Sequence, residues 1–363
     1  MSSQYVLAFL LALAISLVVT PLIRAMALRV NKLDVPNWRK VHTRPIPRLG
    51  GIAITLAFLI PAMLNVPLSR PFWGLLAGVA ILFTVGLVDD LKGLSARYKL
   101  LGQIIAAIVV LAGGIGIVDI TNPFGGQINL DNWRIPVEFF GQSFNILPLA
   151  NLISILWIVG MINTINFLDG LDGLAGGVVS IAGAVIFILA LGPVGGSVTV
   201  ALLAIILVGA CLGFLPYNFY PSRIFMGDSG AYVIGMLLAL LSIYADSKIA
   251  VGSLVLGFAI IDAIVVALRR LALGRSPFSP DRNHLHHQLL DSGLFSHRQV
   301  VVIIYAATLL VAVVLLLAGG VAASAALLLT LALIISVIRI MGPERGFKDI
   351  ETSIKPTKDD SKI

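Results

Sequence analysis

Charged residues are scarce in this chain. Asp, Glu, Lys and Arg make up 12% of its 363 residues, whereas hydrophobic residues make up 58%. Soluble globular domains typically carry about 25% charged residues. The composition therefore excludes an ordinary soluble domain and predicts an integral membrane protein.

Cysteine is nearly absent, and two kinds of motif are missing. The single cysteine, Cys211, excludes an intramolecular disulfide. No basic and aromatic nucleic-acid-binding motif is present, so we expect the net charge of +7 to face anionic lipid headgroups. The histidines in HLHH (284–287) lack the spacing and the Glu of a metalloprotease helix, which argues against a zinc site.

Long apolar runs are abundant instead. A helix needs about 20 predominantly apolar residues to cross a bilayer. The first run lacks the basic region of a signal peptide, so we expect it to be a retained span. The sequence predicts eleven spans, at residues 5–27, 50–67, 72–88, 100–118, 149–166, 174–192, 198–217, 230–245, 249–271, 299–318 and 321–340.

Lysine and arginine predict the orientation of these spans. With the N-terminus outside, the outer connections contain only Arg70, Arg134 and Lys248 of the 25 Lys and Arg residues. Cytoplasmic loops are enriched in these two residues. We therefore predict an N-terminus outside and a C-terminus in the cytoplasm.

Two segments lie outside the predicted spans. The outer connection 119–148 has Gly, Pro and Asn breaks between short runs and is expected to form a small hairpin on the membrane surface. Residues 342–363 are polar and are expected to be a disordered cytoplasmic tail, which leaves residues 1–341 as one polytopic domain. The predicted fold class is all-α, with about eleven transmembrane helices and this outer hairpin.

Polar residues gather in five segments that the predicted topology places on the inner face. Only Lys and Arg defined that topology, so the convergence of Asp, Asn and His is an independent signal. One segment, NTINFLDGLDG (163–173), directly follows an apolar run, and an Asp at the centre of a membrane helix costs about 2.5–3.5 kcal/mol. We interpret it as a helix end that opens into a polar inner mouth. The five segments are residues 40–51, 89–103, 163–177, 217–232 and 275–298.

Acidic side chains in these segments predict a metal site. The five carboxylates are those of Asp89, Asp90, Asp169, Asp172 and Asp228. Crowded carboxylates repel one another unless a cation compensates them. Oxygen ligands with few histidines or thiols favour Mg²⁺ or Mn²⁺.

Glycines and basic residues in the same segments suit a phosphate ligand. Gly227, Gly230 and the pair Gly50-Gly51 are expected to let backbone amides approach a phosphate, the last pair at a helix start. The basic residues expected to neutralise a diphosphate are Lys40, Lys92, Lys99, Arg282, His284, His286 and His287. Metal, carboxylates and cations together predict phosphoryl chemistry at a membrane surface.

Other polar residues have structural interpretations. Asp262, in the ninth span and seven residues before Arg269, is expected to make an ion pair or polar contact. His297 and Arg298 are expected at the membrane interface. His42 fits either loop structure or a phosphate or sugar contact.

The motifs in these segments resemble a known family. The Asp89-Asp90 pair, NxxNxxDGxDGL (163–174), FxGDSG (225–230) and HxHH (284–287) are similar to motifs of the polyprenyl-phosphate N-acetylhexosamine-1-phosphate transferases. The likeness covers about residues 1–340 and is strongest to bacterial undecaprenyl-phosphate N-acetylglucosamine-1-phosphate transferases, which begin O-antigen, enterobacterial common antigen and teichoic acid synthesis. It implies an enzyme of the bacterial cytoplasmic membrane, possessing a cytoplasmic-face site, that transfers a sugar-1-phosphate from a UDP-sugar to a polyprenyl phosphate and releases UMP.

The resemblance also implies a metal site and an acceptor site. Asp228, with Asn166 or Asp172, is expected to hold Mg²⁺. Asp89 and Asp90 are expected to activate or orient the lipid phosphate. A homodimer is expected from the habit of the family.

Further roles follow from the same resemblance. Lys99 is expected near the phosphates, Phe225 against the uracil ring, and the segment 282–287 around the diphosphate and sugar. The candidate catalytic residues are Asp89, Asp90, Lys99, Asp172 and His284, the candidate substrate-binding residues are Lys40, His42, Asn163, Asp169, Phe225, Arg282, His286 and His287, and the candidate metal ligands are Asp228, Asn166 and Asp172.

The donor sugar and the mechanism stay open at this point. The peptidoglycan translocase for MurNAc-pentapeptide typically has ten spans and an unbroken run of three histidines, so the eleventh span and HLHH (284–287) favour the GlcNAc branch over that enzyme. UDP-GalNAc and UDP-MurNAc-pentapeptide stay alternative donors. A single in-line displacement and a two-step route through an aspartyl-phosphate both fit the residues. Two other classes compete with this interpretation. A cation-coupled transporter would place its carboxylates near mid-span. A lipid phosphatase would use the same metal and cations but pass the phosphoryl group to water.

Overall fold

An α-helix lies in each of the eleven predicted spans. The computed structural model describes residues 2–35, 44–121, 127–139, 142–192, 196–244, 256–272, 274, 284–318 and 320–341. The helices that coincide with predicted spans are α1 (Ser2–Arg29), α2 (Gly50–Asn65), α3 (Arg70–Lys92), α4 (Ala96–Ala112), α5 (Pro148–Leu168), α6 (Leu174–Ala190), α7 (Val198–Asn218), α8 (Gly227–Tyr244), α10 (Gly257–Ala272), α12 (His297–Ala318) and α13 (Gly320–Met341). A short additional helix, α11 (Leu285–Asp291), follows the first histidine of HLHH.

The helices have the length and composition of a multi-pass membrane protein. Among the described residues, six helices are long and apolar enough to cross a bilayer: α1, α3, α5, α7, α8 and α12. Shorter apolar stretches lie in α2, α6, α10 and α13. The chain is therefore a largely helical multi-pass membrane protein, while the number of crossings and their orientation stay predictions.

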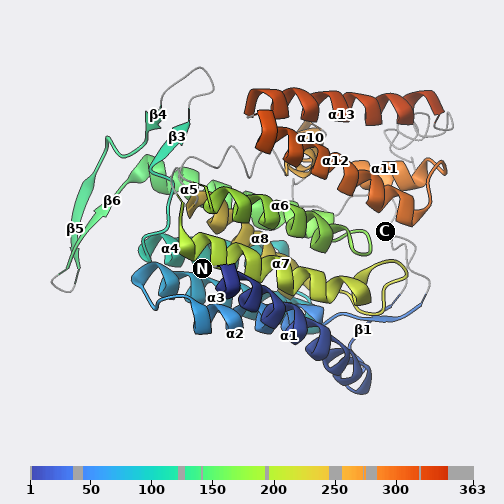
Figure 1. Ribbon diagram of the computed structural model, residues 1–363, viewed down its shortest axis with the longest axis horizontal. Helices are drawn as coiled ribbons and strands as arrows, with labels where there is room; N and C mark the ends of the chain where they lie inside the picture. Colours follow the sequence, from blue (N-terminus) through green and yellow to red (C-terminus); the bar gives the residue numbers. More distant parts are fainter. Residues whose placement is uncertain are drawn as a thin grey trace, which may run out of the picture.

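Small antiparallel hairpins occupy the connection predicted to contain one. Strand β3 (Asp119–Thr121) pairs with β4 (Gln127–Asn129), and β5 (Ile135–Phe139) pairs with β6 (Gln142–Ile146). These hairpins project from one end of the helix bundle, whereas α11 lies toward the opposite end (Figure 1). A third pair, β1 (Leu33–Asp34) with β2 (Ile46–Pro47), joins α1 to α2. The predicted tail, residues 342–363, lies outside the described residues.

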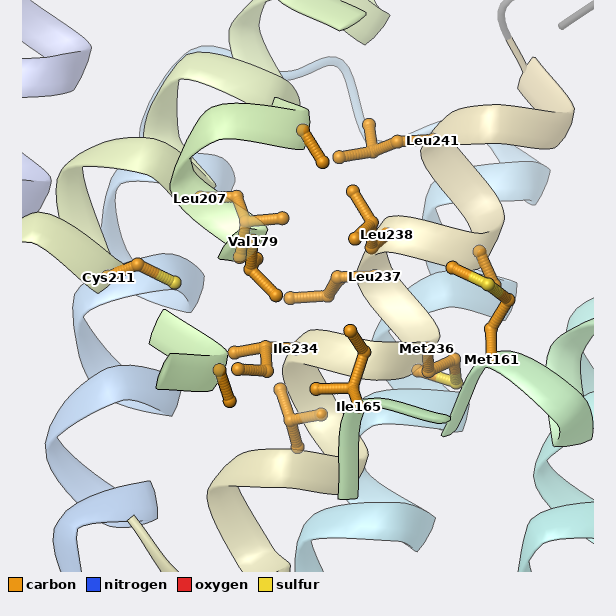
Figure 2. Close-up of a cluster of buried hydrophobic side chains, with 14 of the residues drawn as sticks. Met161, Ile165, Val179, Leu207, Cys211, Ile234, Met236, Leu237, Leu238 and Leu241 are labelled. Carbon is orange, nitrogen blue, oxygen red and sulfur yellow. The ribbon is translucent and has the colours of Figure 1, made fainter. Parts of the chain in front are cut away.

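Helix α8 is the centre of the bundle. Every residue from Gly227 to Ser242 is buried. Side chains of α5, α6 and α7 surround it, with Met161, Ile165, Val179, Leu207 and Cys211 gathered around Ile234, Met236, Leu237, Leu238 and Leu241 (Figure 2). Because lipid tails are as apolar as leucine, close packing rather than apolar burial holds such helices together. The first turn of α8 is therefore fixed by neighbours on several sides.

Glycines let neighbouring helices approach that first turn. A Cβ added to Gly51 of α2 would lie 2.2 Å from the Gly230 nitrogen, and one added to Gly86 of α3 would lie 2.5 Å from Ser229 Cα. The Gly50 and Gly51 amides donate to the carbonyls of Phe225 (2.9 Å) and Met226 (2.7 Å). Our prediction that the Gly50-Gly51 amides meet a phosphate is therefore wrong, because the segment before α8 already uses them.

We expect Gly51→Ala to destabilise the bundle. The added methyl would meet backbone atoms, which cannot move aside as a side chain can, and overpacking of this kind costs about 1–3 kcal/mol. The midpoint of thermal unfolding in detergent can be followed with a thiol-reactive dye, because Cys211 is the only cysteine and is 1% exposed. Gly160→Ala is the matched control, since nothing lies within 4 Å of its added Cβ. Equal midpoints for the two variants would contradict the packing argument.

Candidate active site

Three carboxylates meet at the junction of α3 and α8. Asp89 and Asp90 lie in the last turn of α3, and Asp228 is the second residue of α8. Each offers an oxygen, and these oxygens lie within 4.8 Å of one another. Three negative charges this close require compensation.

Two cations bridge the carboxylates. Lys99 Nζ lies 2.8 Å from Asp89 Oδ2 and 2.9 Å from Asp228 Oδ2. Arg48 reaches the other side, with Nη2 2.8 Å from Asp228 Oδ1 and Nε 3.1 Å from Asp90 Oδ1. Burial alone would lower the pKa of Arg48, but the carboxylates of Asp228 and Asp90 outweigh it and raise that pKa. Asp228 is therefore the shared partner of both cations.

Both carboxylate oxygens of Asp90 accept hydrogen bonds from the first turn of α8. Its Oδ1 accepts from the Asp228 amide (2.9 Å), and its Oδ2 accepts from the Ser229 amide (3.1 Å) and hydroxyl (2.6 Å). The first amides of a helix have no partner within it, so Asp90 acts as a cap supplied by another helix. With Arg48 as a fourth partner, the Asp90 side chain is 0% exposed. This geometry gives Asp90 a positioning role.

Asp89 and Asp228 differ from Asp90 in their partners. Asp89 accepts from the Leu94 amide (2.7 Å) and from Lys99. Asp228 also accepts from the Tyr232 hydroxyl (2.7 Å) and from Nδ2 of Asn166 (3.3 Å). The Asn166 nitrogen points to Asp228, and among the described residues its carbonyl oxygen has no hydrogen-bond partner.

The donor set is of the kind that Mg²⁺ prefers. Asp228, Asp89 and the Asn166 side chain offer hard oxygens, and no cysteine or histidine belongs to this group of residues. Oxygen ligands suit Mg²⁺ or Mn²⁺, whereas zinc favours nitrogen and sulfur. The residues therefore fit a magnesium ion, and Arg48 and Lys99 balance part of the negative charge of the carboxylates.

The other predicted ligand, Asp172, lies in the loop between α5 and α6 and has different partners. Its Oδ2 accepts from the Ser222 amide (2.9 Å), and its own amide donates to Nε2 of His297 (3.0 Å). The Gly173 amide, next in the chain, donates to Asn218 Oδ1 (3.1 Å). These bonds join the 169–173 loop to the end of α7, to the segment between α7 and α8, and to the start of α12.

Asp169 begins the same loop and keeps its carboxylate without a hydrogen-bond partner among the described residues. Burial raises the pKa of Asp169 well above its usual range, and the carboxylates of Asp228, Asp90 and Asp172 raise it further, while Arg48 opposes them. A carboxyl of this kind is available to a ligand that donates hydrogen bonds.

The histidine segment packs on this loop. A Cβ added to Gly170 would lie 3.0 Å from His286 Nε2 and 3.2 Å from His287 Nε2. The rings of His286 and His287 lie 4.4 Å apart, and His284 lies 5.0 Å from Phe167. Burial lowers the pKa of His286 well below its usual range, and the two histidines beside it act in the same direction. The structure therefore brings the third and fifth predicted segments together.

The remaining predicted residues have varied places. Asn163 donates to Gln103 Oε1 (2.7 Å) within the bundle, although it shares a helix face with Asn166. Phe225 is half-buried, and its amide donates to the Pro47 carbonyl (2.8 Å). Lys40, His42 and Arg282 lie outside the described residues.

Sequence reasoning missed several residues of the site. Arg48 was counted only as an inner charge, although its position two residues before Gly50-Gly51 fixes its reach to Asp228. His297 was expected at the membrane interface but is 6% exposed and holds the Asp172 amide. Tyr232 is four residues after Asp228 and so lies above it on α8, a spacing that was readable from the sequence.

Comparison with known proteins identifies the family of the chain. The profile of Glycosyl transferase family 4 matches residues 72–246. A Bacillus subtilis (strain 168) protein named probable undecaprenyl-phosphate N-acetylglucosaminyl 1-phosphate transferase is 33% identical over 306 residues, which cover 82% of this chain and 80% of that protein.

Two other relatives carry related names. The decaprenyl-phosphate N-acetylglucosaminephosphotransferase of Mycobacterium tuberculosis (strain ATCC 25618 / H37Rv) is 35% identical over 313 residues, 77% of this chain and 74% of that protein. The undecaprenyl-phosphate alpha-N-acetylglucosaminyl 1-phosphate transferase of Thermotoga maritima is 31% identical over 280 residues, 75% of this chain and 78% of that protein. This chain therefore belongs to the polyprenyl-phosphate N-acetylhexosamine-1-phosphate transferases.

Proposed function

We propose that the protein transfers GlcNAc-1-phosphate from UDP-GlcNAc to undecaprenyl phosphate and releases UMP. The product is a lipid-linked diphosphate sugar, and the reaction is the first membrane step of a cell-envelope polysaccharide. The observation that carries the proposal is the bridged group of Asp89, Asp90 and Asp228 with Lys99 and Arg48. The names of the relatives support GlcNAc as the sugar.

Mg²⁺ is the proposed cofactor, held by Asp228 and Asn166 with Asp89. The family resemblance left either Asn166 or Asp172 as the partner of Asp228, and we favour Asn166 because the Asp172 carboxylate already accepts from the Ser222 amide. When bound, the ion supplies positive charge that weakens repulsion between the two phosphate groups and stabilises the departing UMP.

The chain's own residues position the reactants. Lys99 joins Asp89 to Asp228 and places an ammonium group where a phosphate oxygen can share it. Asp89, which has two partners, is better suited than Asp90 to orient the acceptor phosphate, because four bonds occupy Asp90. Asp169 and the histidine segment supply hydrogen-bonding groups for the sugar nucleotide.

We propose the cytoplasmic membrane as the location, with the site on the cytoplasmic face. The distribution of Lys and Arg supports this orientation, because nearly all of them lie on the side of the polar segments. The hairpins and α11 lie toward opposite ends of the bundle, as two distinct membrane faces require (Figure 1). A homodimer stays an expectation from the resemblance.

We expect sealed inside-out membrane vesicles to convert radiolabelled UDP-GlcNAc into chloroform-soluble lipid when undecaprenyl phosphate and Mg²⁺ are present. A sugar nucleotide cannot cross a bilayer, so sealed vesicles of the opposite orientation should form little labelled lipid. Parallel reactions with UDP-GalNAc and UDP-MurNAc-pentapeptide establish the donor. Absence of lipid-linked label with every donor would refute the proposed reaction, and equal rates in both vesicle orientations would refute the proposed face.

A further inference from the structure

A carboxylate from α10, outside the acidic group, holds one residue of the histidine segment. Asp262 Oδ2 lies 2.8 Å from Nδ1 of His284. Asp262 Oδ1 accepts from the Leu285 amide, also at 2.8 Å. Leu285 is the first residue of α11. One carboxylate therefore fixes both the imidazole ring and the start of the helix that carries His286 and His287.

The pair is almost enclosed. The side chains of His284 and Asp262 are 5% and 11% exposed. Hydrogen bonds between polar groups are stronger in such surroundings than in water. An ionised carboxylate can only accept, so the shared proton belongs to Nδ1 of His284. This assignment leaves Nε2 as the nitrogen that can meet a ligand.

The free nitrogen has no competing partner among the residues that the structure describes. Nε2 of His284 makes no hydrogen bond with these residues. It is also not among the fully buried side-chain nitrogens, so it keeps some exposed surface. The ring packs at 5.0 Å on Phe167 and at 5.6 Å on His286. Phe167 directly follows Asn166, the residue bonded to Asp228. The oriented imidazole therefore packs on the residue that directly follows a hydrogen-bond partner of Asp228.

Resting on the proposed function, we propose that Asp262 is a positioning residue that fixes His284 with its proton on Nδ1 and presents Nε2 to the sugar nucleotide. Asp262 has no direct contact with substrate in this arrangement and acts through His284. Removing a carboxylate that orients a metal-bound histidine typically costs about 10- to 100-fold in metal affinity or activity, and we expect a loss of similar size for a histidine oriented toward a substrate.

The first test reads the tautomer without any assay of activity. The protein has five histidines, so ¹⁵N-histidine labelling gives few NMR signals, and the one lost in His284→Gln belongs to His284. We expect a protonated Nδ1 and an unprotonated Nε2 in the wild-type protein, and a change toward the other tautomer in Asp262→Asn. A protonated Nε2 with a bare Nδ1 in the wild type, or the same tautomer in both proteins, overturns the proposal.

The second test is a double-mutant cycle in the transfer assay. Asp262→Asn should lower kcat about 10- to 100-fold, Asp262→Glu should restore part of the loss, and Asp262→Asn should have no further effect in a His284→Gln background. Thr308→Val, which removes a buried hydroxyl bonded within α12, is the control for a purely structural loss and should leave kcat unchanged. Additive losses for Asp262→Asn and His284→Gln overturn the proposal. If the wild type transfers no label, the proposed function falls, and the NMR result still decides the role of Asp262.

Discussion

Asp228→Asn should lower the rate of sugar-phosphate transfer by about 10³-fold or more. The carboxylate accepts from Arg48, Lys99, Tyr232 and Asn166, and an amide carries no charge and has one acceptor oxygen in place of two. The substitution would therefore remove the negative charge that holds Arg48 and Lys99, and it would also remove the proposed carboxylate ligand of Mg²⁺. Initial rates of lipid-linked label, measured across a series of Mg²⁺ concentrations, give the size of the effect.

The control for Asp228→Asn is the same chemical change at a remote place. Asp131→Asn alters a carboxylate in the connection that carries the hairpins, where it pairs with Arg134. This variant should keep nearly the wild-type rate, since surface ion pairs contribute about 0–1 kcal/mol. Transfer by Asp228→Asn within tenfold of wild type would show that Asp228 is not the centre of the site.

Asp90→Asn should unfold more easily than the wild type as well as lose activity. An asparagine has a single acceptor oxygen in its side chain. It therefore cannot accept all four bonds that Asp90 accepts, from the Asp228 amide, the Ser229 amide and hydroxyl, and Arg48. A buried donor without a partner costs about 1–3 kcal/mol. Breaking a fully buried ion pair costs about 3–5 kcal/mol. The cost of breaking the Arg48–Asp90 pair is lower than this range because the Arg48 side chain is about one-third exposed. The thermal unfolding midpoint, read from dye labelling of Cys211, should fall clearly.

Asp89→Asn is the matched comparison for this second prediction. Asp89 accepts hydrogen bonds from the Leu94 amide and from Lys99, and neither belongs to the start of α8. We therefore expect Asp89→Asn to lose activity with a smaller fall in the unfolding midpoint. A larger fall for Asp89→Asn than for Asp90→Asn would contradict the division of roles between the two neighbours.

The class of protein and the positions of its helices were readable from the sequence. Long apolar runs are local properties, and a membrane helix satisfies its backbone hydrogen bonds within the run itself. Each of the eleven predicted spans accordingly contains a helix, and the connection at 119–148 forms hairpins. The Asp, Asn and His motifs were equally readable, because their residue types and spacing carry the family resemblance.

The partners of those residues were beyond the sequence. Adjacent in the chain, Asp89 and Asp90 look equivalent, yet they point to different groups because successive residues of a helix face directions about 100° apart. The glycines at Gly50-Gly51 suggested a phosphate site, but their amides meet the carbonyls before α8. His297 was taken for an interfacial residue and instead supports the Asp172 amide.

By itself, then, the sequence determined a multi-pass helical membrane protein whose acidic and imidazole residues gather in a few polar connections. Only the tertiary structure decided which cation meets which carboxylate, that Asp90 holds the first turn of α8, and that Asp262 orients His284. The physical reason is distance: hydropathy acts along tens of residues of one segment, whereas hydrogen bonds and ion pairs act over about 3–4 Å between segments far apart in the chain.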